Sequence, residues 1–514
     1  MIPVLTPEQS NSWDDRAAEA GIELVTLMEN AGRAAAAVLA NRYSHALRNG
    51  VLVAAGPGNN GGDGWVIARA LHRADIPVWV AASGEGSRLR EQMAQLGRAE
   101  GVREVTPDGP WPAVGLAVDA LLGTGATGTP RPVIAGLLGR IHDLDIPVVA
   151  IDGPTGVDLL TGIVHGTTRA DLTITFGGFR RGHLLARDEI GDVAVVDIGH
   201  PAPDPQWPIV VTDQLAAGWM RRLHAGDHKG DRGRVVVVGG DIGMSGALRL
   251  AARAAFAAGA GLVHAVAPAD TIAALVQAEP DLQTMAHSFD DKPSRSLLDL
   301  IASADAIVVG PGLGRSPGRR SFVTAVVGAA RSAVLDADAL VAFAGAAAEI
   351  GSLSEGRHLV LTPHPGEFRT LFPALAAARE LDPWGAASIA ADDIGATILL
   401  KGVPTVVAAP ERQLLTVVAG NPGLATGGSG DVLSGLVASQ LTTTPAPEIA
   451  AAVGAQILGR AADIAARRHT ARGMRPMDVI HALPDLWREW EVLGSGSVVA
   501  RPPLIFELRR PHTT

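Results

Sequence analysis

The chain contains no cysteine among its 514 residues. Disulfide bonds and thiolate metal sites are therefore excluded. Large aromatic side chains are also few, with one tyrosine and nine phenylalanines. The hydrophobic cores must therefore rest largely on Ala, Val, Leu and Ile.

Lysine is the next residue type in short supply. Of the 43 basic residues only three are lysines, Lys229, Lys292 and Lys401, and the formal net charge is −10. Because there is no long basic run, we expect no nucleic acid and no anionic membrane as the main partner. Lys229 and Lys401 stand beside glycines that flank predicted strands, which suggests phosphate contact. At Lys229 an ordinary surface lysine is an equally good interpretation.

Targeting and membrane-spanning signals are missing from the stretches where they would be expected. Residues 1–8 lack a basic and apolar leader, and no run of eighteen residues is uninterruptedly apolar. We therefore expect a cytoplasmic protein.

The pattern that is present alternates short apolar runs, glycine-rich loops and helical segments. Residues 51–55 lead into a loop at 56–64, and residues 235–238 lead into a loop at 239–246, each followed by a helical pattern. Continuous apolar runs of this length predict parallel strands covered by helices on both faces. Two such openings in a chain of this length predict an α/β fold with two domains.

Local signals give the expected boundaries of these domains. Residues 1–212 form the first domain and residues 224–492 the second, joined by a linker at 213–223 and followed by a tail at 493–514. Helices should occupy most of residues 7–48 with a break at Gly21, because Thr6 and Gln9 can form a capping box. Further strands are predicted at 76–82, 116–119, 147–151, 171–176 and 193–197 in the first domain, and at 306–309, 358–361 and 398–400 in the second, followed by a hairpin from 406–409 and 414–418.

Polar residues follow several predicted strands of the first domain. Asn59 and Asn60 open a glycine-rich stretch, Asp119 ends one strand, and Asp152 and Thr155 follow another. Ligands collect at the carboxyl ends of parallel strands, so these groups can share one crevice. Asparagine carbonyls are neutral oxygen ligands, which suit a weakly held cation. The alternative is that these loops only turn the chain between strands.

Together these motifs resemble NAD(P)H-hydrate epimerase, the YjeF N-terminal family, over residues 1 to about 212. The resemblance implies a Rossmann-like α/β/α unit that binds K⁺ through Asn60, Asp119 and Thr155, where threonine keeps the hydroxyl of the family's usual serine. It implies that Asp152 is the acid/base residue. The implied substrate-binding residues are Asn59, Asn60, Gly61, Gly62, Asp63, Gly123, Thr124, Gly125, Ala126, Thr127, Gly128, Thr129 and Asp152.

The second domain carries a phosphoryl-transfer pattern near its end. Residues 427–430, Gly-Gly-Ser-Gly, lead into a helical segment with Asp431 in its first turn. Backbone N–H groups at such a helix start bind anions, and the lack of Cβ atoms lets a phosphate approach. A carboxylate beside that phosphate is useful if it accepts the proton of an attacking hydroxyl. For His364, in a turn after a predicted strand, ligand contact and a structural role are equally open.

With the loops near residues 247 and 312, this pattern resembles the ADP-dependent NAD(P)H-hydrate dehydratase family over residues 224–482. The resemblance implies a ribokinase-like α/β/α unit that uses ADP and Mg²⁺, with Asp431 as the general base. The implied substrate-binding residues are Ala247, Gly312, Gly314, His364 and Asp431. The implied nucleotide-binding residues are Lys401, Gly402, Val403, Pro404, Thr405 and Gly430.

The predicted function is therefore repair of hydrated nicotinamide nucleotides. The first domain would interconvert the R and S forms of NADHX and NADPHX, and the second would dehydrate the S form, using ADP. We also expect an oligomer of identical chains. One alternative is a vitamin kinase of the ribokinase-like type, phosphorylating a thiazole or pyrimidine alcohol. Another is a non-enzymatic first domain, like the related scaffolds of RNA-decapping assemblies.

Overall fold

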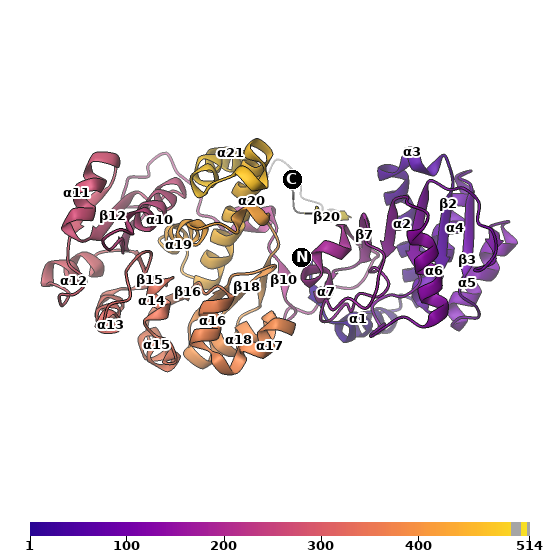
Figure 1. The fold of residues 1–514 in the computed structure, drawn as a ribbon, viewed down its shortest axis with the longest axis horizontal. Coiled ribbons are helices and arrows are strands. Elements are labelled where there is room, and N and C mark those ends of the chain that lie inside the picture. The colour runs from indigo at the N-terminus through magenta and orange to yellow at the C-terminus, as the bar shows by residue number, and fades with distance from the viewer. Residues whose placement is uncertain (495–504, 511–514) are drawn as a thin grey trace. The chain divides into compact units, whose positions relative to one another are not determined.

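The computed structural model describes residues 1–494 and 505–510. These residues form two compact units, one up to Trp207 with a strand at 505–508, and the other from Pro208 onwards. Each unit is a largely parallel sheet with helices on both faces (Figure 1), so the predicted fold class is confirmed. The expected linker at 213–223 and tail at 493–514 remain predictions, and residues 495–504 and 511–514 of that tail lie outside the described residues.

The first unit is built on an eight-stranded sheet of order β20-β9-β7-β6-β5-β2-β3-β4, in which only β20 is antiparallel to its neighbour. All five further predicted strands are present. Four of them begin and end within one residue of the observed limits, and the fifth begins two residues later than predicted. The strands are β2 (Val51–Ala55), β3 (Val78–Ala82), β4 (Arg103–Val105), β5 (Leu116–Ala120), β6 (Val148–Ile151), β7 (Leu172–Phe176), β9 (Asp192–Val196) and β20 (Ile505–Leu508), and β1 (Val4–Leu5) pairs separately with β8 (Phe179–Arg180).

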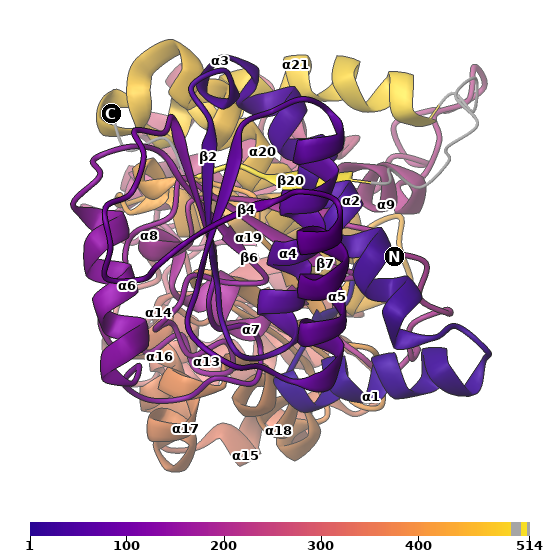
Figure 2. The ribbon, with the colours of Figure 1, turned by 90° about the vertical axis from the view of Figure 1, so that its right-hand side faces the viewer.

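Alternate residues of β2 face opposite sides of this sheet, as the two-residue period of a strand requires. Val51, Val53 and Ala55 pack with α2, α4 and α5, whereas Leu52 and Ala54 pack with α6. Figure 2 shows these helices on the two sides of the strands. The helices are α1 (Pro7–Glu19), α2 (Leu24–Arg42), α3 (Ser44–Leu47), α4 (Asn59–Arg73), α5 (Arg88–Ala99), α6 (Pro132–His142), α7 (Arg181–Leu185) and α8 (Arg187–Ile190).

Local sequence signals explain where the first helices begin and end. Thr6 caps α1, its hydroxyl accepting from the Gln9 amide and the Gln9 side chain accepting from the Thr6 N–H, so the predicted capping box is present. The predicted break lies at Gly21, whose φ of +86° interrupts the helical run. One expectation was wrong: residues 59–64 are not a loop but the first turns of α4. Their glycines are tolerated in a helix because they allow close packing, as at Gly62 against the Met28 sulfur.

The second unit contains a ten-stranded sheet of order β10-β19-β18-β17-β16-β15-β14-β11-β12-β13. The predicted hairpin is present, since β18 and β19 are antiparallel and β18 also pairs antiparallel with β17. The strands are β10 (Ile209–Val210), β11 (Arg234–Val238), β12 (Leu262–Ala267), β13 (Gln283–Ala286), β14 (Ala306–Val309), β15 (Ser332–Leu335), β16 (His358–Leu361), β17 (Thr397–Leu400), β18 (Thr405–Ala408) and β19 (Leu415–Val417).

Helices cover both faces of this second sheet (Figure 1). Its longest helix, α20, is apolar and long enough to cross a membrane, yet 78% of its most apolar window is buried inside the unit, which identifies it as a core helix. The helices are α9 (Asp213–Trp219), α10 (Ser245–Ala257), α11 (Ala269–Ala278), α12 (Arg295–Ala302), α13 (Arg319–Ala329), α14 (Asp338–Val341), α15 (Ala347–Ser354), α16 (Pro365–Leu371), α17 (Ala376–Leu381), α18 (Pro383–Ile394), α19 (Ser429–Leu441), α20 (Pro447–Gly473) and α21 (Pro476–Gly494), with 3-10 turns η1 (Pro373–Leu375) and η2 (Pro422–Leu424).

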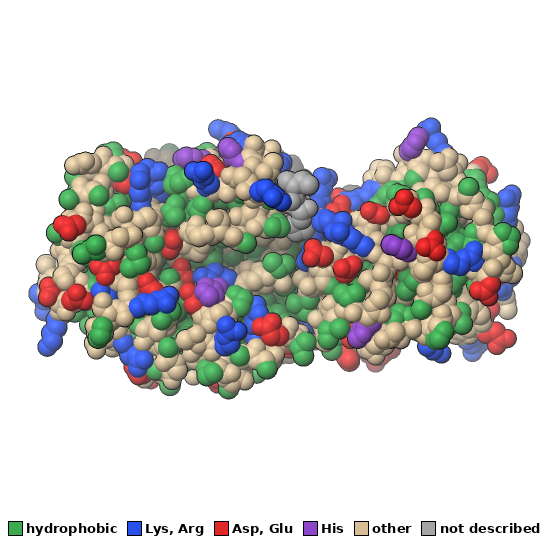
Figure 3. Space-filling view, in the orientation of Figure 1, with side chains coloured by type: hydrophobic (Ala, Val, Ile, Leu, Met, Phe, Trp, Pro, Cys, Tyr) green, Lys and Arg blue, Asp and Glu red, His purple; other side chains and the backbone are tan. Residues whose placement is uncertain are grey.

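The surface carries charges of both signs. On the face shown in Figure 3, the Lys and Arg side chains are interspersed with Asp and Glu. No continuous basic surface is seen on this face.

Candidate active sites

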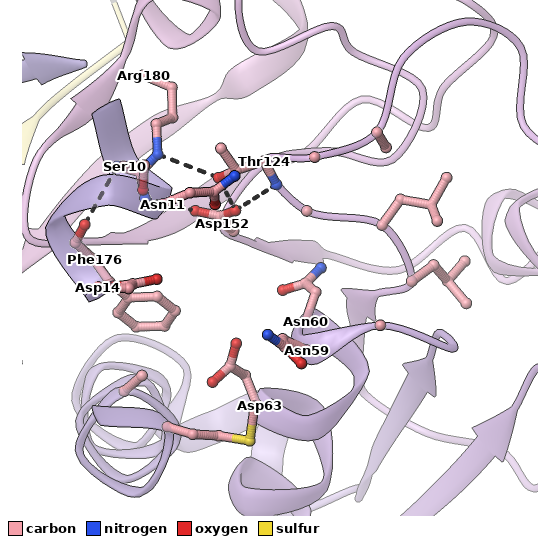
Figure 4. Close-up of a pocket in the computed structure, with 18 of the residues that line it drawn as sticks. Ser10, Asn11, Asp14, Asn59, Asn60, Asp63, Thr124, Asp152, Phe176 and Arg180 are labelled. Carbon is pink, nitrogen blue, oxygen red and sulfur yellow. Dashed lines mark hydrogen bonds and ion pairs between the residues drawn. The ribbon is translucent and has the colours of Figure 1, made fainter. Parts of the chain in front are cut away.

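A cavity of about 590 Å³ opens at the carboxyl ends of the first sheet. Most residues predicted to bind substrate line it, including Asn59, Asn60, Asp63, Asp152 and the whole loop from 123 to 129. Gly61, Gly62, Asp119 and Thr155 do not line it. Figure 4 shows Asp152 and Thr124 on one side of this cavity and Asp63, on α4, on the other. The predicted convergence of strand-end loops is therefore observed.

The start of α4 depends on glycine for its approach to the neighbouring strand end. A Cβ at Gly61 would overlap the carbonyl oxygen of Gly56, and a Cβ at Gly56 would overlap the carbonyl oxygen of Leu121. Both partners are backbone atoms, which cannot rotate away. The two glycines therefore bring the start of α4 next to the loop after β5, where both contribute to the cavity wall.

Asp152 is held in place by its neighbours. The Thr124 N–H donates to Asp152 Oδ2 at 2.6 Å, the Thr124 hydroxyl donates to the same oxygen, and Arg180 Nη2 lies 3.3 Å from Oδ1. Burial opposes ionisation of this carboxyl, but the Arg180 charge and the hydrogen bonds from Thr124 outweigh it and lower its pKa below the ordinary range. Asp152 is therefore an anion in the unliganded site.

Arg180 is a part of this site that sequence reasoning missed. Its side chain is 5% exposed, and its guanidinium also donates to the carbonyl oxygens of Phe176 and Gly178. Behind it, His183 Nδ1 accepts from the Arg180 N–H, and His183 Nε2 donates to the Asp152 carbonyl oxygen at 2.6 Å. Burial lowers the pKa of His183 to about 4, so its ring is neutral. The only sequence signal was an arginine close behind a buried strand.

Two of the three predicted K⁺ ligands, Asp119 and Thr155, are hydrogen-bonded to each other. The Thr155 hydroxyl donates to Asp119 Oδ1 at 2.7 Å, and the Thr155 N–H donates to Oδ2 at 2.8 Å. Asp119 is buried and its pKa is raised, chiefly by burial. Both polar atoms of the Asn60 amide are buried without a hydrogen-bond partner.

These residues fit a monovalent cation. Asp119 forms no ion pair with a basic side chain in the described part of the chain, and Asn60 offers an unused carbonyl oxygen. A cation would satisfy both, because buried carboxylates and amides need a partner. The amide oxygen of Asn60 and the hydroxyl of Thr155 are neutral oxygen ligands, which suit a weakly bound ion.

The second site lies at the start of α19. Its N-cap, Gly428, has a left-handed φ of +100°, and Asp431 lies in the first helical turn as predicted. The Ser429 hydroxyl is buried without a hydrogen-bond partner. The N–H groups of this turn, together with that hydroxyl, can donate hydrogen bonds to a phosphate.

Charged side chains from other strand ends lie against this turn. Lys401 Nζ lies 2.9 Å from Asp336 Oδ1 and 3.7 Å from Glu367 Oε2. Burial opposes the charge of Lys401, but Asp336 and Glu367 outweigh it and raise its pKa. The pKa of Asp431 is raised to about 7, first by burial and then by the negative charge of Asp336. Asp336 was missed by sequence reasoning.

The remaining predicted residues of the second unit lie in neighbouring loops. A Cβ at Gly312 would come within 3.3 Å of the Ala247 Cβ, so the two predicted contacts lie side by side. Gly314 donates its N–H to Asp338 and lines a separate cavity of about 240 Å³. His364 caps α16, its Nδ1 accepting from the Gly366 N–H at 2.9 Å, while the ring is 56% exposed. His364 therefore has a structural role, and its Nε2 lies 3.5 Å from Glu367 Oε1.

The predicted nucleotide-binding segment from Lys401 to Thr405 forms the turn between β17 and β18. The Thr405 hydroxyl donates to the carbonyl oxygen of Gly402 at 3.2 Å, and Val403 is 72% exposed. Gly430 lies against the first residue of this turn, since a Cβ there would be 3.3 Å from Lys401 Nζ. The turn and the start of α19 are therefore adjacent.

Comparison with known proteins gives consistent matches to both halves. The sequence model of the family described as YjeF-related protein N-terminus matches residues 25–182. The sequence model of the NAD(P)H-hydrate dehydratase family matches residues 235–485. The bifunctional NAD(P)H-hydrate repair enzyme Nnr of Escherichia coli is 36% identical over 475 residues, covering 90% of this chain and 89% of that protein. The protein of the same name from Moorella thermoacetica is 35% identical over 514 residues, covering 91% and 93%.

The chain belongs to the bifunctional NAD(P)H-hydrate repair enzyme family. Among solved structures, the ADP/ATP-dependent NAD(P)H-hydrate dehydratase from Bacillus subtilis, co-crystallized with ATP and Mg²⁺, is 26% identical, with a TM-score of 0.48, over 54% of this chain and 97% of that chain. The two family models and the two similar enzymes confirm, at the level of family, the resemblance that the motifs indicate. Asp119 and Asp152 fall within the first matched segment, and Asp336 and Asp431 within the second.

Proposed function

We propose that this chain repairs hydrated NADH and NADPH, with epimerisation in the first unit and nucleotide-dependent dehydration in the second. The observation that carries this proposal is the start of α19, where a glycine turn that can accept phosphate adjoins a carboxyl whose pKa is about 7. A general base works best when its pKa lies near the operating pH. Membership of the family supplies the class of substrate.

In the second unit Asp431 accepts the proton of the substrate hydroxyl. The hydroxyl oxygen attacks the terminal phosphorus of ADP, a P–O bond forms, and the bond to the AMP oxygen breaks. The amides at the start of α19 stabilise the charge that develops on the transferred group. Phosphate then leaves the ring carbon with the C–O bonding electrons, and loss of a proton from the neighbouring carbon restores the nicotinamide ring.

ADP and Mg²⁺ complete this second site. Lys401, Gly402, Val403, Pro404, Thr405 and Gly430 are the proposed contacts of the nucleotide, and Ala247, Gly312, Gly314 and His364 those of the hydrated substrate. Mg²⁺ would neutralise charge on the phosphates. Because the described residues offer no cluster of three acidic ligands, the nucleotide phosphates and water would be its main ligands.

In the first unit Asp152 takes the proton of the hydroxyl on the hydrated carbon, so that a carbonyl forms and the ring C–N bond breaks with its electrons going to nitrogen. The nitrogen then attacks the other face of the carbonyl, the C–N bond re-forms, and Asp152 returns the proton to the oxygen. The low pKa of Asp152 keeps it in the ionised form that this step requires. The loop from 123 to 129 and the start of α4 bind the rest of the nucleotide through their amides. Asn60, Asp119 and Thr155 would hold K⁺, which adds positive charge beside the bound phosphates.

One assay tests both activities on the full chain. Purified protein is mixed with hydrated NADH, Mg²⁺ and either ADP or ATP, and the recovery of nicotinamide absorbance is followed. We expect recovery with a nucleotide and none without it; absence of recovery with both nucleotides rejects the dehydratase. Substitution of Asp152 by Ala should block use of the R form above its spontaneous conversion, while use of the S form continues.

The substitution Asp299→Asn provides a matched control for both sites. Asp299 lies on α12, its side chain is 61% exposed, and its partner is the surface residue Arg295. Loss of one carboxylate there should leave both rates unchanged. If Asp152→Ala consumes the R form as fast as this control does, Asp152 is not the epimerase base.

A further inference from the structure

Asp336 is a buried carboxylate whose backbone is fixed at the end of β15. Its side chain is 2% exposed, and its N–H donates to the Val309 carbonyl oxygen at 3.1 Å. Its own carbonyl oxygen lies against Gly310, where a Cβ would overlap it. These contacts fix the backbone that carries the carboxylate, and the carboxylate itself pairs with Lys401 at 2.9 Å.

This ion pair lies directly against the turn that starts α19. A Cβ on Gly430 would be 3.3 Å from Lys401 Nζ and 3.6 Å from Asp336 Oδ2. Glycine at this position therefore lets both charged groups approach the turn. The next residue along the chain is Asp431, so a buried negative charge and a buried positive charge both lie close to the proposed base.

We propose that Asp336 is a positioning residue of the second site: it holds the Lys401 ammonium against the residue 427–430 turn and, as a fixed negative charge, makes Asp431 a stronger proton acceptor. This inference rests on the proposed dehydration and extends it to a residue without a substrate contact of its own. Asp336 acts through Lys401, whose ammonium it holds at 2.9 Å, closer than Glu367 does at 3.7 Å.

The charges around Asp431 determine the direction of this effect. Burial and the negative charges of Asp336, Asp338 and Glu367 raise the Asp431 pKa, and Lys401 is the group that lowers it. Asp338 is already paired with Arg315, and Glu367 accepts from the His364 N–H. Of these carboxylates Asp336 has the largest effect on Asp431. Removing the Asp336 charge should therefore lower the Asp431 pKa, and removing the Lys401 charge should raise it.

The test compares the pH dependence of dehydration in three variants of the full chain. Single-turnover rates are measured with enzyme in excess over hydrated NADH and with saturating ADP and Mg²⁺, so that product release does not contribute. In the wild type we expect the rate to fall to half near the pKa of Asp431. In Asp336→Asn the midpoint should move to lower pH by about one unit or more, as expected for loss of a close like charge.

The second and third variants separate charge from structure. Lys401→Met should move the midpoint to higher pH, opposite to Asp336→Asn, even though it also raises the KM for ADP. Asp299→Asn should leave the midpoint where it is. A purely structural role for Asp336 would reduce the rate or the melting temperature of the variant without moving the midpoint in opposite directions in the two variants.

Each outcome decides a separate claim. If wild type dehydrates but the midpoint stays unmoved in Asp336→Asn, or moves in the same direction in both variants, the positioning role is overturned and the proposed function stands. If Asp336→Asn fails to fold, an unmoved or lowered midpoint in Lys401→Met overturns the role, and a raised one supports it. If wild type does not dehydrate with ADP or ATP, both the function and the role are rejected.

Discussion

The ionised carboxylate of Asp431 should lower the stability of the folded protein at neutral pH. The substitution Asp431→Asn should remove this effect. Asn has the shape of Asp but cannot ionise. In the described part of the chain no hydrogen bond is donated to the Asp431 carboxylate. The asparagine side chain that replaces it therefore loses no hydrogen-bond partner. We therefore expect the variant to lose turnover, by about 10²–10⁴-fold, because general-base catalysis contributes a factor of this size. We also expect it to be more stable than the wild type at neutral pH.

The size of this stabilisation follows from the difference between the folded and unfolded pKa values. In the folded chain the Asp431 pKa is about 7, against an ordinary value of 3.8. Well below pH 3.8 both states are protonated, so this group does not favour unfolding. As the pH rises towards 7 the unfolded state ionises first, and stability is lost until the folded pKa is passed. Each pH unit of difference is worth ~1.4 kcal/mol, which gives a ceiling of ~4 kcal/mol above pH 7.

Calorimetry of the full chain can measure this gain. The two units need not unfold in one transition, so the transition of the second unit is first identified as the one that ADP moves to higher temperature. Asp431→Asn should raise the temperature of that transition by several degrees at pH 8 and by less at pH 5. The control Asp299→Asn should change neither. An Asp431→Asn transition that is unmoved or lowered at pH 8 would contradict the inference that this carboxyl is held at an unfavourable site.

Three further changes test the first unit. Arg180→Met should destabilise that unit by ~3–5 kcal/mol and abolish epimerisation, because it leaves the Asp152 carboxylate buried without its cation. Arg180→Lys should recover part of the stability and part of the activity. A fully active Arg180→Met would show that this ion pair is not needed. Gly61→Ala should lower the melting temperature of the first unit and its epimerase activity with dehydration intact, because its Cβ would overlap backbone at Gly56; normal epimerisation would show that the helix start can shift. Deletion of residues 505–514 should expose the edge of β9 and lower the same transition; an unchanged transition would mean that β20 adds no stability to the sheet.

The positions of the strands and of the carboxylates that follow them were largely accessible from the sequence. A buried parallel strand is a continuous apolar run, and the residue that ends it lies at the edge where ligands collect, so Asp119 and Asp152 could be placed without coordinates. The same reasoning placed Asp431, because a glycine turn before an apolar helix has few other uses. Both sites were therefore predicted from local patterns, and their residue roles remain proposals.

The parts that could not be predicted depend on long-range contacts. Arg180 and Asp336 act through partners 28 and 65 residues away in sequence, and no local period or motif distinguishes them from other charged residues that follow strands. The strand β20 follows a long helix of the second unit but pairs with β9 of the first, with Ile505 opposite Val196. Such a partner can be found only when the edge of the first sheet is known.

The two proposed bases differ in the charge placed beside each, and this difference fits the chemistry asked of each. Asp152 has an arginine on one oxygen and two donors on the other, which keeps it ionised and fixed in one orientation. Asp431 has a lysine nearby, but that lysine is bound by Asp336 and Glu367, so burial first and then the negative charge of Asp336 raise the proton affinity of Asp431. A base that removes a proton during inversion and then returns it can be weak. A base that must remove a proton while the hydroxyl attacks a phosphate has to bind it well, and the second site provides that affinity through the placement of Asp336.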